Sequence, residues 1–403
     1  MRAYERLLKY AKIDTQSDPN SDTLPSAPKE LDLTKLLQQE LKEMGIESKI
    51  SAKGYLYACL KGNVDAEPIG FLAHVDTAQG ITDTNCKPRI EEHWDGKDIK
   101  LNEQYSLSLN DYPVMRKYIG KSLMVTGGDT LLGADDKAGV AEIMTLAEKL
   151  TKDPSIKHGD VWIAFTPDEE IGRGTEGFEL KEFPVKFAYT LDGDAVNGIE
   201  YENFNAASAV VEVTGKLIHT GDAKGKMINS QNIAIDFHNL LPVPMRPEYT
   251  EKREGFFHLD SITGDVEKTT MYYLIRNHDK ETFEKMKRLM IEAEHYLNSL
   301  YPQKVIKVTI SDTYANMLEC FKDKMYIIDL AKEAMKKVGL EPYSSPIRGG
   351  TDGASLSYMG IPCPNLGTGG GNYHGRYEYA VIEDMDKAVE VIEQIVGLVA
   401  DKQ

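Results

Sequence analysis

Residues 69–77 read IGFLAHVDT and decide the fold class of this chain. Their apolar start, 69–73, is the short continuous run typical of a strand buried on both faces of a sheet. His74 and Asp76 follow that run directly. In an open α/β sheet, ligands bind at the carboxyl ends of the strands. The segment therefore predicts an α/β sheet with a functional site at the end of this strand.

Similar apolar runs and helical patterns surround this strand. Further buried strands are expected at 56–60, 161–165 and 187–191. Apolar residues recur at helical spacing in 1–11, 29–44 and 138–150, with a loop rich in Ser, Asp and Pro at 17–28. Strands that alternate with helices predict an α/β sheet covered by helices on both faces.

The pattern changes after about residue 204. Strands are expected at 209–213, 256–262, 270–275 and 305–310, and helices at 228–240 and 281–300. This β-α-β-β-α-β order predicts a ferredoxin-like α+β unit. From residue 316 the α/β character returns, with helices near 322–338 and 385–401. A chain of 403 residues is also long for a single core, so we expect two domains, one inserted into the other.

Composition excludes several classes of partner. The formal net charge of −17 argues against nucleic acid, because neutralising phosphates requires clustered Lys and Arg. No apolar run approaches the roughly 20 residues that span a bilayer, and the charged start, MRAYER, does not resemble a signal peptide. The four cysteines form no CxxC pair, so neither a disulfide scaffold nor a thiolate zinc site is indicated. We therefore expect a cytoplasmic protein that binds neither nucleic acid nor membranes.

Five segments carry acidic residues or histidines in positions that suit a metal site. They are 73–77 (AHVDT), 133–137 (GADDK), 166–170 (TPDEE), 191–194 (LDGD) and 372–375 (NYHG). Three of them directly follow an apolar strand, so their side chains should converge at one edge of the sheet. This mixture of ligands suits zinc, cobalt or manganese. Taken singly, each segment also fits a core histidine, a solvated acidic pair or a helix N-cap, but the combination favours a metal centre.

These segments resemble those of the peptidase T family, tripeptide aminopeptidases within the superfamily of two-zinc exopeptidases and aminoacylases. The resemblance covers essentially the whole chain and includes 219–225 (HTGDAKG), 346–354 (PIRGGTDGA) and 369–379. It implies a zinc-exopeptidase α/β catalytic domain in two pieces, 1–204 and 316–403. It also implies that 205–315 form a lid and dimerisation domain, and that the protein is a homodimer through this domain.

The resemblance further implies a cofactor of two Zn²⁺ per subunit. Each zinc would have its own pair of ligands and both would share a bridging carboxylate: His74 with Asp192, Glu170 with His374, and Asp135 between the ions. Three carboxylates and one bridging hydroxide would balance the four positive charges, so the centre could lie in a partly dry crevice. The family pattern also implies a cis peptide bond between Asp135 and Asp136.

Two acidic residues resemble the catalytic residues of the family. Glu169 resembles the general base. This base takes a proton from the water shared by the two zinc ions, which leaves the attacking hydroxide, and passes that proton to the leaving amine. Asp76 is similar to the aspartate that orients the imidazole of His74. The expected activity is metal-dependent hydrolysis of the N-terminal peptide bond of short peptides, preferentially tripeptides.

The substrate-binding residues implied by the resemblance lie mostly in the inserted domain. His219 resembles a histidine that stabilises the oxyanion, and Arg276 resembles an arginine that binds the substrate carboxylate. Arg348 is a third candidate, with bracing of its glycine-rich loop as the alternative. The chain departs from the family pattern at Thr220, at Asn277 and at 370–372. These departures bear on lid geometry and substrate preference, and none of them is at a metal ligand.

Other functions fit the same metal ligands. A dipeptidase, a carboxypeptidase or an N-acyl amino acid deacylase would share the zinc chemistry and differ in the substrate end that is recognised. A non-catalytic peptide-binding protein has no use for a free base such as Glu169. A nucleotide-dependent oxidoreductase is disfavoured, because the glycines at 369–371 do not open a helix after a strand at the required spacing.

Overall fold

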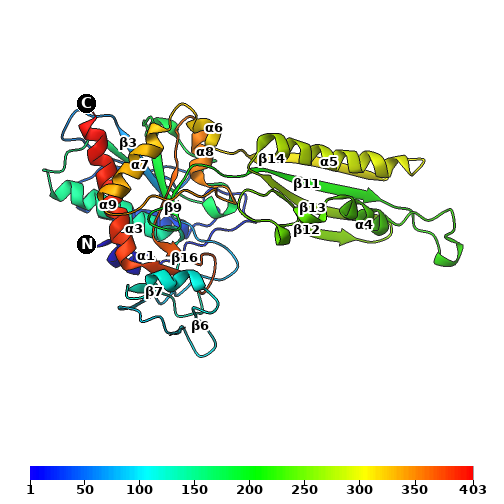
Figure 1. Cartoon of the computed structure of the whole chain (residues 1–403), viewed down its shortest axis with the longest axis horizontal. Coiled ribbons are helices and arrows are strands. Elements are labelled where there is room, and N and C mark those ends of the chain that lie inside the picture. The colour runs from blue at the N-terminus through cyan, green and yellow to red at the C-terminus, as the bar shows by residue number, and fades with distance from the viewer. Residues whose placement is uncertain (403) are drawn as a thin grey trace. The chain divides into compact units, whose positions relative to one another are not determined.

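The computed structural model describes residues 1–402 and divides into two compact units (Figure 1). The first unit contains Met1–Tyr201, Cys320–Ser345 and residues 351–402. The second contains Glu202–Glu319 and Pro346–Gly350. The sequence had placed this last short segment with the catalytic domain. No helix within residues 1–402 is long and apolar enough to cross a membrane.

A mixed sheet of seven strands forms the centre of the first unit. In spatial order its strands are β1 (Ser48–Ile50), β2 (Leu56–Leu60), β8 (Val161–Thr166), β3 (Ile69–His74), β9 (Ala188–Gly193), β15 (Asn365–Gly367) and β10 (Ile199–Glu200). The neighbours β8, β3, β9 and β15 are parallel, so their carboxyl ends share one edge. The sequence predicted β2, β3, β8 and β9 as buried strands, and the structure confirms them.

Helices cover both faces of this sheet, as predicted. The helices of the first unit are α1 (Ala3–Tyr10), α2 (Glu30–Glu43), α3 (Ala134–Lys152), α7 (Tyr326–Lys337), α8 (Asp352–Tyr358) and α9 (Ile382–Asp401). The short helix α6 (Leu318–Phe321) spans the point in the chain where the second unit ends and the first resumes. Adjacent residues of β3 face opposite sides. Leu72 belongs to a core cluster with Leu356 of α8, whereas Phe71 stacks on Tyr189, whose hydroxyl donates to the carbonyl of Ile327 in α7.

A second, smaller sheet in the first unit was not predicted from the sequence. It contains β16 (Gly370–Gly371), β17 (Tyr379–Val381), β7 (Leu123–Val125) and β4 (Arg89–Glu91), and lies near the hairpin of β5 (Ile99–Lys100) and β6 (Ser106–Leu107). Strands this short carry too few residues for a recognisable alternating pattern. The sheet matters for function because it fixes the hairpin β16–β17, which carries His374.

The second unit confirms the predicted β-α-β-β-α-β order. Its elements are β11 (Asn205–Thr214), α4 (Ser230–Leu240), β12 (Phe256–Gly264), β13 (Lys268–Asn277), α5 (Lys280–Ser299) and β14 (Ile306–Tyr314). The antiparallel sheet has the order β12-β13-β11-β14, and α4 and α5 both contact β13. Val211, Phe237 and Tyr273 lie in the buried core between helices and sheet.

Short 3₁₀ helices complete the chain. They are η1 (Pro113–Tyr118), η2 (Glu169–Ile171), η3 (Leu180–Glu182), η4 (Thr220–Asp222), η5 (Val243–Met245) and η6 (Pro247–Tyr249). Of these, η2 bears directly on function, because it holds two of the predicted site residues immediately after β8.

A buried carboxylate on α3 provides a test of packing in the first unit. Glu142 is fully buried, and neither carboxylate oxygen has a hydrogen-bond partner within residues 1–402. Burial raises the pKa of Glu142 well above its ordinary value, so stability falls as pH rises above the unfolded pKa of about 4.3. Between the unfolded and the folded pKa of Glu142, each pH unit lowers the free energy of unfolding by about 1.4 kcal/mol. We therefore expect the stability of Glu142→Gln relative to the wild type to increase from about pH 4 to about pH 7, measured by urea unfolding.

Glu148 on the same helix is the matched control, with the opposite sign. Burial alone would raise its pKa, but hydrogen bonds from Lys152, the N-terminal ammonium and Arg6 lower it to about 2. Its charged form therefore stabilises the fold above the unfolded pKa, and this contribution disappears as pH falls towards 2. Glu148→Gln should lower stability at pH 7. If both variants changed stability in the same direction, the assigned environment of Glu142 would be incorrect.

Candidate metal centre

The five predicted metal ligands lie together in the first unit. His74 ends β3, Asp192 lies in β9, and Glu170 lies in η2 directly after β8. Because these strands are parallel, the three side chains reach the same edge of the sheet. Asp135 comes from the first turn of α3, and His374 from the loop between β16 and β17. The strand-end argument therefore located three of the five correctly in space.

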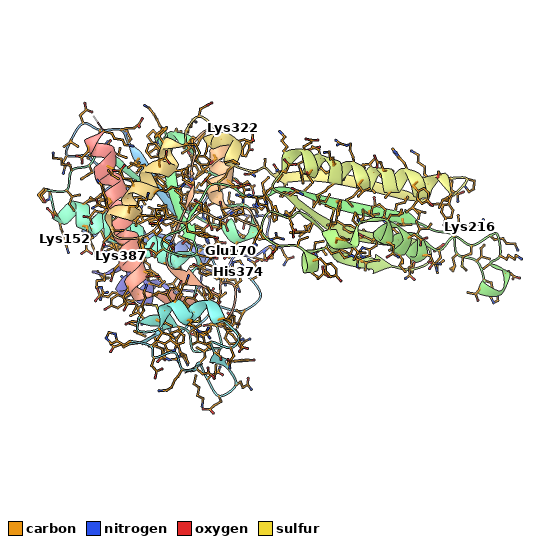
Figure 2. The ribbon with its side chains drawn as sticks, in the orientation of Figure 1. Lys152, Glu170, Lys216, Lys322, His374 and Lys387 are labelled. Carbon is orange, nitrogen blue, oxygen red and sulfur yellow. The ribbon has the colours of Figure 1, made fainter. Side chains whose placement is uncertain are left out.

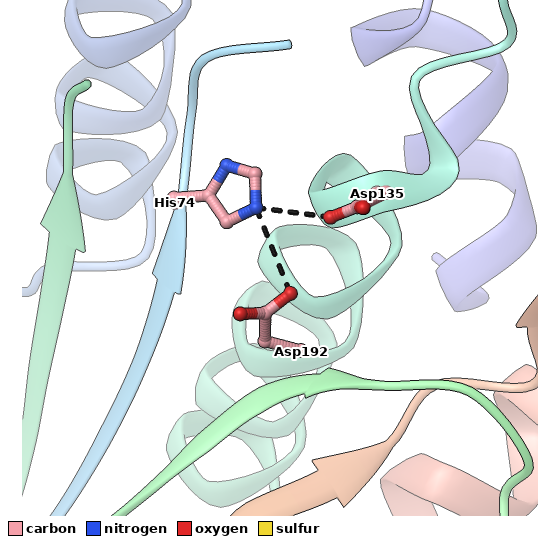
Figure 3. A group of neighbouring side chains, drawn as sticks. All are labelled: His74, Asp135 and Asp192. Carbon is pink, nitrogen blue, oxygen red and sulfur yellow. Dashed lines mark hydrogen bonds and ion pairs between the residues drawn. The ribbon is translucent and has the colours of Figure 1, made fainter. Parts of the chain in front are cut away.

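His74, Asp135 and Asp192 form the first group of possible metal ligands (Figure 3). The Nε2 atom of His74 lies 3.0 Å from Oδ1 of Asp135 and 3.6 Å from Oδ1 of Asp192. All three side chains are largely removed from solvent, with 2%, 15% and 10% of their surfaces exposed. Figure 3 shows the imidazole and both carboxylates pointing at one another.

Asp135, Glu170 and His374 form the second group. The Nε2 atom of His374 lies 3.1 Å from Oδ2 of Asp135 and 3.2 Å from Oε2 of Glu170. Glu170 and His374 are both labelled in the first unit in Figure 2. Asp135 belongs to both groups and uses a different oxygen for each histidine. Its carboxylate thus connects two adjacent sites.

The chemistry of these atoms fits divalent cations. His74 Nε2 can donate at most one proton, yet two carboxylates face it. In the second group, Oε1 of Glu170 is buried and has no hydrogen-bond partner in the described part of the chain. Buried acceptor atoms that converge in this way are costly unless a cation compensates them. Imidazole nitrogens with carboxylate oxygens are ligands that zinc accepts.

The ionisable groups perturb one another strongly. Hydrogen bonds to Asp135 and Glu170 raise the pKa of His374 to about 11. Burial would raise the pKa of Asp135, but hydrogen bonds from His374 and His74 outweigh it and hold that pKa well below its ordinary value. Burial raises the pKa of Asp192 to about 7. Perturbations this dense are typical of functional sites.

Asp76 supports the centre in two ways, and the sequence predicted one of them. Its side chain is fully buried. Nδ1 of His74, the nitrogen that faces away from the ligand group, lies 3.0 Å from the backbone carbonyl oxygen of Asp76 and 3.3 Å from its Oδ1. The same carboxylate accepts the backbone N–H groups of Glu169 at 3.0 Å and Glu170 at 3.1 Å. Asp76 therefore positions two candidate ligands: the imidazole ring of His74 and the backbone of Glu170.

Glu169 is close to the candidate ligands and is not one of them. It begins η2, and its backbone N–H donates to Oδ1 of Asp76 at 3.0 Å. Burial raises its pKa well above the ordinary value, and the charge of Asp192 raises it further. A carboxylate in this position is free to accept and donate protons.

The peptide bond between Asp135 and Asp136 is cis, which confirms the prediction. Asp136 is fully buried and makes contacts that the sequence did not predict. Its Oδ2 accepts the backbone N–H of His74 at 3.1 Å, and its Oδ1 accepts that of Gly139 at 3.2 Å. The acidic pair at the start of α3 thus divides its contacts between the ligand groups and the backbone of β3.

The three substrate-binding candidates lie in the second unit. His219 precedes η4 and is highly exposed, with 81% of its side chain accessible. Arg276, near the end of β13, donates from Nη1 to the carbonyls of Ala207 and Ile275. Arg348 donates to Lys252, Glu254 and Thr250, and its guanidinium lies over the rings of Phe204 and Phe256. These contacts of Arg348 favour the bracing role that the sequence left open.

Known proteins are similar to this chain over its whole length. Residues 132–397 match peptidase family M20/M25/M40. The chain is 52% identical to peptidase T of Clostridium perfringens over 404 residues, which covers 100% of both chains. It is 50% identical to peptidase T of Bacillus subtilis over 396 residues, covering 97% of each.

Solved structures share the fold. An aminopeptidase PepT from Bacillus cereus superimposes with a TM-score of 0.79 at 22% identity, covering 99% of this chain and 98% of the other. A tripeptidase from Staphylococcus aureus gives a TM-score of 0.80 at 19% identity, covering 100% and 98%. The two-unit architecture is therefore common to this chain and these enzymes.

Proposed function

Because the chain belongs to peptidase family M20/M25/M40, we propose that it is a two-zinc aminopeptidase that releases the N-terminal residue of short peptides, preferentially tripeptides. One observation carries the metal part of this proposal: the carboxylate of Asp135 faces His74 with one oxygen and His374 with the other. A carboxylate shared between two ligand groups is suited to bridge two metal ions. The substrate class is supported by the full-length similarity to proteins named peptidase T.

In this proposal, five residues of the first unit hold the metals. His74 and Asp192 would hold one zinc, Glu170 and His374 would hold the other, and Asp135 would serve both. When bound, two zinc ions lower the pKa of a shared water and polarise the scissile carbonyl. Asp76 keeps the ring of His74 and the backbone of Glu170 in position through the contacts described above.

Glu169 moves the protons of the reaction. Its carboxylate takes a proton from the attacking water and delivers it to the nitrogen of the leaving peptide. Glu170 cannot perform this step while it serves as a ligand. The carboxylate of Glu169 is the better base because it lies beside the ligand groups and belongs to neither of them.

The second unit supplies substrate contacts and the dimer interface in this proposal. His219 stabilises the oxyanion, and Arg276 binds the carboxylate at the C-terminus of the peptide. Within residues 1–402, the backbone hydrogen bonds of Arg276 come from Nη1. A guanidinium has five N–H donors, so the remaining donors suit a carboxylate. All four cysteines are free thiols, in keeping with a reducing compartment such as the cytoplasm.

Product analysis tests the substrate class directly. Zinc-loaded protein is incubated with di-, tri- and tetrapeptides that are free or blocked at either end. We expect release of the N-terminal residue from free tripeptides at the highest rate. Cleavage of N-acylated substrates would instead indicate a deacylase, and release of the C-terminal residue a carboxypeptidase.

Arg276→Ala tests recognition of the substrate carboxylate. Loss of a charge-assisted hydrogen bond costs about 1.5–3 kcal/mol, so kcat/KM for free tripeptides should fall roughly 10- to 150-fold. C-terminally amidated tripeptides lack that carboxylate, so the variant should process them at nearly the wild-type rate. Arg348→Ala is the matched control, because that arginine braces the segment 250–254, so its loss should affect free and amidated peptides alike. An equal loss for free and amidated peptides in Arg276→Ala would make the residue structural.

A further inference from the structure

Glu378 makes an unusual set of contacts at the start of α3. Its side chain is buried, with 1% of the residue exposed. Oε2 accepts the backbone N–H groups of Leu132 at 2.7 Å and Gly133 at 2.8 Å, and Oε1 accepts that of Asp135 at 3.0 Å. One carboxylate thus satisfies three backbone donors, including the N–H of the residue shared by both ligand groups.

The start of α3 has no local group that could replace these contacts. The residue at the N-cap position is Gly133, with φ of +74° and no side chain to accept a hydrogen bond. The first N–H groups of any helix lack partners within the helix. Their partial positive charge also favours a carboxylate at this end. Glu378 is therefore the cap of a helix that begins more than 240 residues earlier in the sequence.

Glu378 also belongs to the segment that carries His374. The two residues share the loop between β16 and β17, and Glu378 donates its own N–H to the carbonyl of Gly375. Asn372 closes this loop by donating to the carbonyl of Tyr377, and Arg376 donates to the carbonyl of Gly128, in the segment before α3. The Asp135 backbone and the His374 loop are thus connected through one buried carboxylate.

We propose that Glu378 is a positioning residue of the metal centre, which fixes the bridging carboxylate of Asp135 relative to His374 through its three backbone hydrogen bonds. The inference rests on the proposed function, because it assigns a role toward the two metals. It concerns a residue outside the ligand set, acting through the backbone of Asp135. Groups that orient metal ligands in this way typically change metal affinity or activity 10- to 100-fold when they are mutated.

Glu378→Gln is the sharpest variant, because it keeps the shape of the side chain. A glutamine has one oxygen, and its NH₂ group must then face at least one of the three backbone N–H groups. We expect the dissociation constant for zinc, measured by competition with a chromogenic chelator, to rise roughly 10- to 100-fold. The visible spectrum of the cobalt-substituted protein should change, and kcat should fall while KM changes less than about threefold.

Glu383→Gln is the matched control in the same unit. Glu383 also accepts a backbone N–H with its carboxylate, that of Ser122 at 3.0 and 2.9 Å, and contacts none of the candidate ligands. The Glu383→Gln variant should have lower thermal stability than the wild type, with the same zinc affinity and the same cobalt spectrum. Glu378→Asp is a second variant, because it keeps the charge on a side chain one methylene shorter. Its zinc affinity should lie between those of the wild type and Glu378→Gln.

The outcomes separate this inference from the function on which it rests. If wild-type protein binds two zinc ions and hydrolyses peptides, but both Glu378 variants match it in zinc affinity and cobalt spectrum, Glu378 is only a helix cap and the inference is wrong. If Glu378→Gln does not fold, the comparison of Glu378→Asp with the wild type decides by the same criteria. Wild-type protein that binds no zinc would overturn both the proposed function and this inference.

Discussion

Glu169→Ala is expected to lower kcat about 10²- to 10⁴-fold while the protein still binds two zinc ions. General acid–base catalysis by a positioned side chain contributes a factor of this size. Glu169 lies beside both ligand groups but belongs to neither, so its removal takes away a proton carrier and leaves the metal ligands intact. KM should change little, because the lost interaction acts in the transition state.

The neighbouring residue provides the matched control. Glu170→Ala removes a ligand of the second group, so it should lose bound zinc as well as activity. The two variants differ by one position in the same 3₁₀ helix, yet they separate proton transfer from metal binding. Zinc content by elemental analysis and kcat on a free tripeptide measure the difference. Near-normal turnover in Glu169→Ala would show that another group acts as the base.

Strand-end reasoning from the sequence was most successful where the chemistry follows a long apolar run. His74 and Asp192 lie at the ends of parallel strands that were predicted from their continuous apolar runs. The inserted ferredoxin-like unit was also predictable, since each of its strands and helices is nine residues or longer. The family resemblance added the roles of Asp135 and His374, which no strand end indicated.

The sequence could not predict contacts made by backbone atoms across long separations. Glu378 binds N–H groups of residues 132, 133 and 135, which lie at least 243 positions away. Asp76 likewise binds the backbone of Glu169, 93 positions away. An acidic side chain in a loop carries no sequence signal of such a partner, because any backbone N–H can serve. The small sheet around β16 and β17, which makes the Glu378 contact possible, was not predicted because its strands are too short to show an alternating pattern.

Asp135→Ala is expected to have the largest effect on the metal centre, because this carboxylate belongs to both ligand groups. The variant should bind well under one zinc per chain, and kcat/KM should fall roughly 10³-fold or more, as several kcal/mol of transition-state stabilisation are lost. Asp192→Ala and His374→Ala each remove a ligand from one group only. Each of these two variants should retain about one zinc ion and lose the other. The site that loses its ion should differ between the two variants.

The pattern across the three variants carries more weight than any single loss of activity. A shared ligand predicts that Asp135→Ala removes both ions, whereas two independent sites would leave one of them in place. The unfolding temperature of each metal-free variant is the control for folding, because a misfolded protein also loses its metal. If Asp135→Ala still bound one zinc as tightly as the wild type, the carboxylate would serve a single ion. The observation that its two oxygens face different histidines would then reflect hydrogen bonding alone, and the two-metal mechanism would lose its bridging ligand.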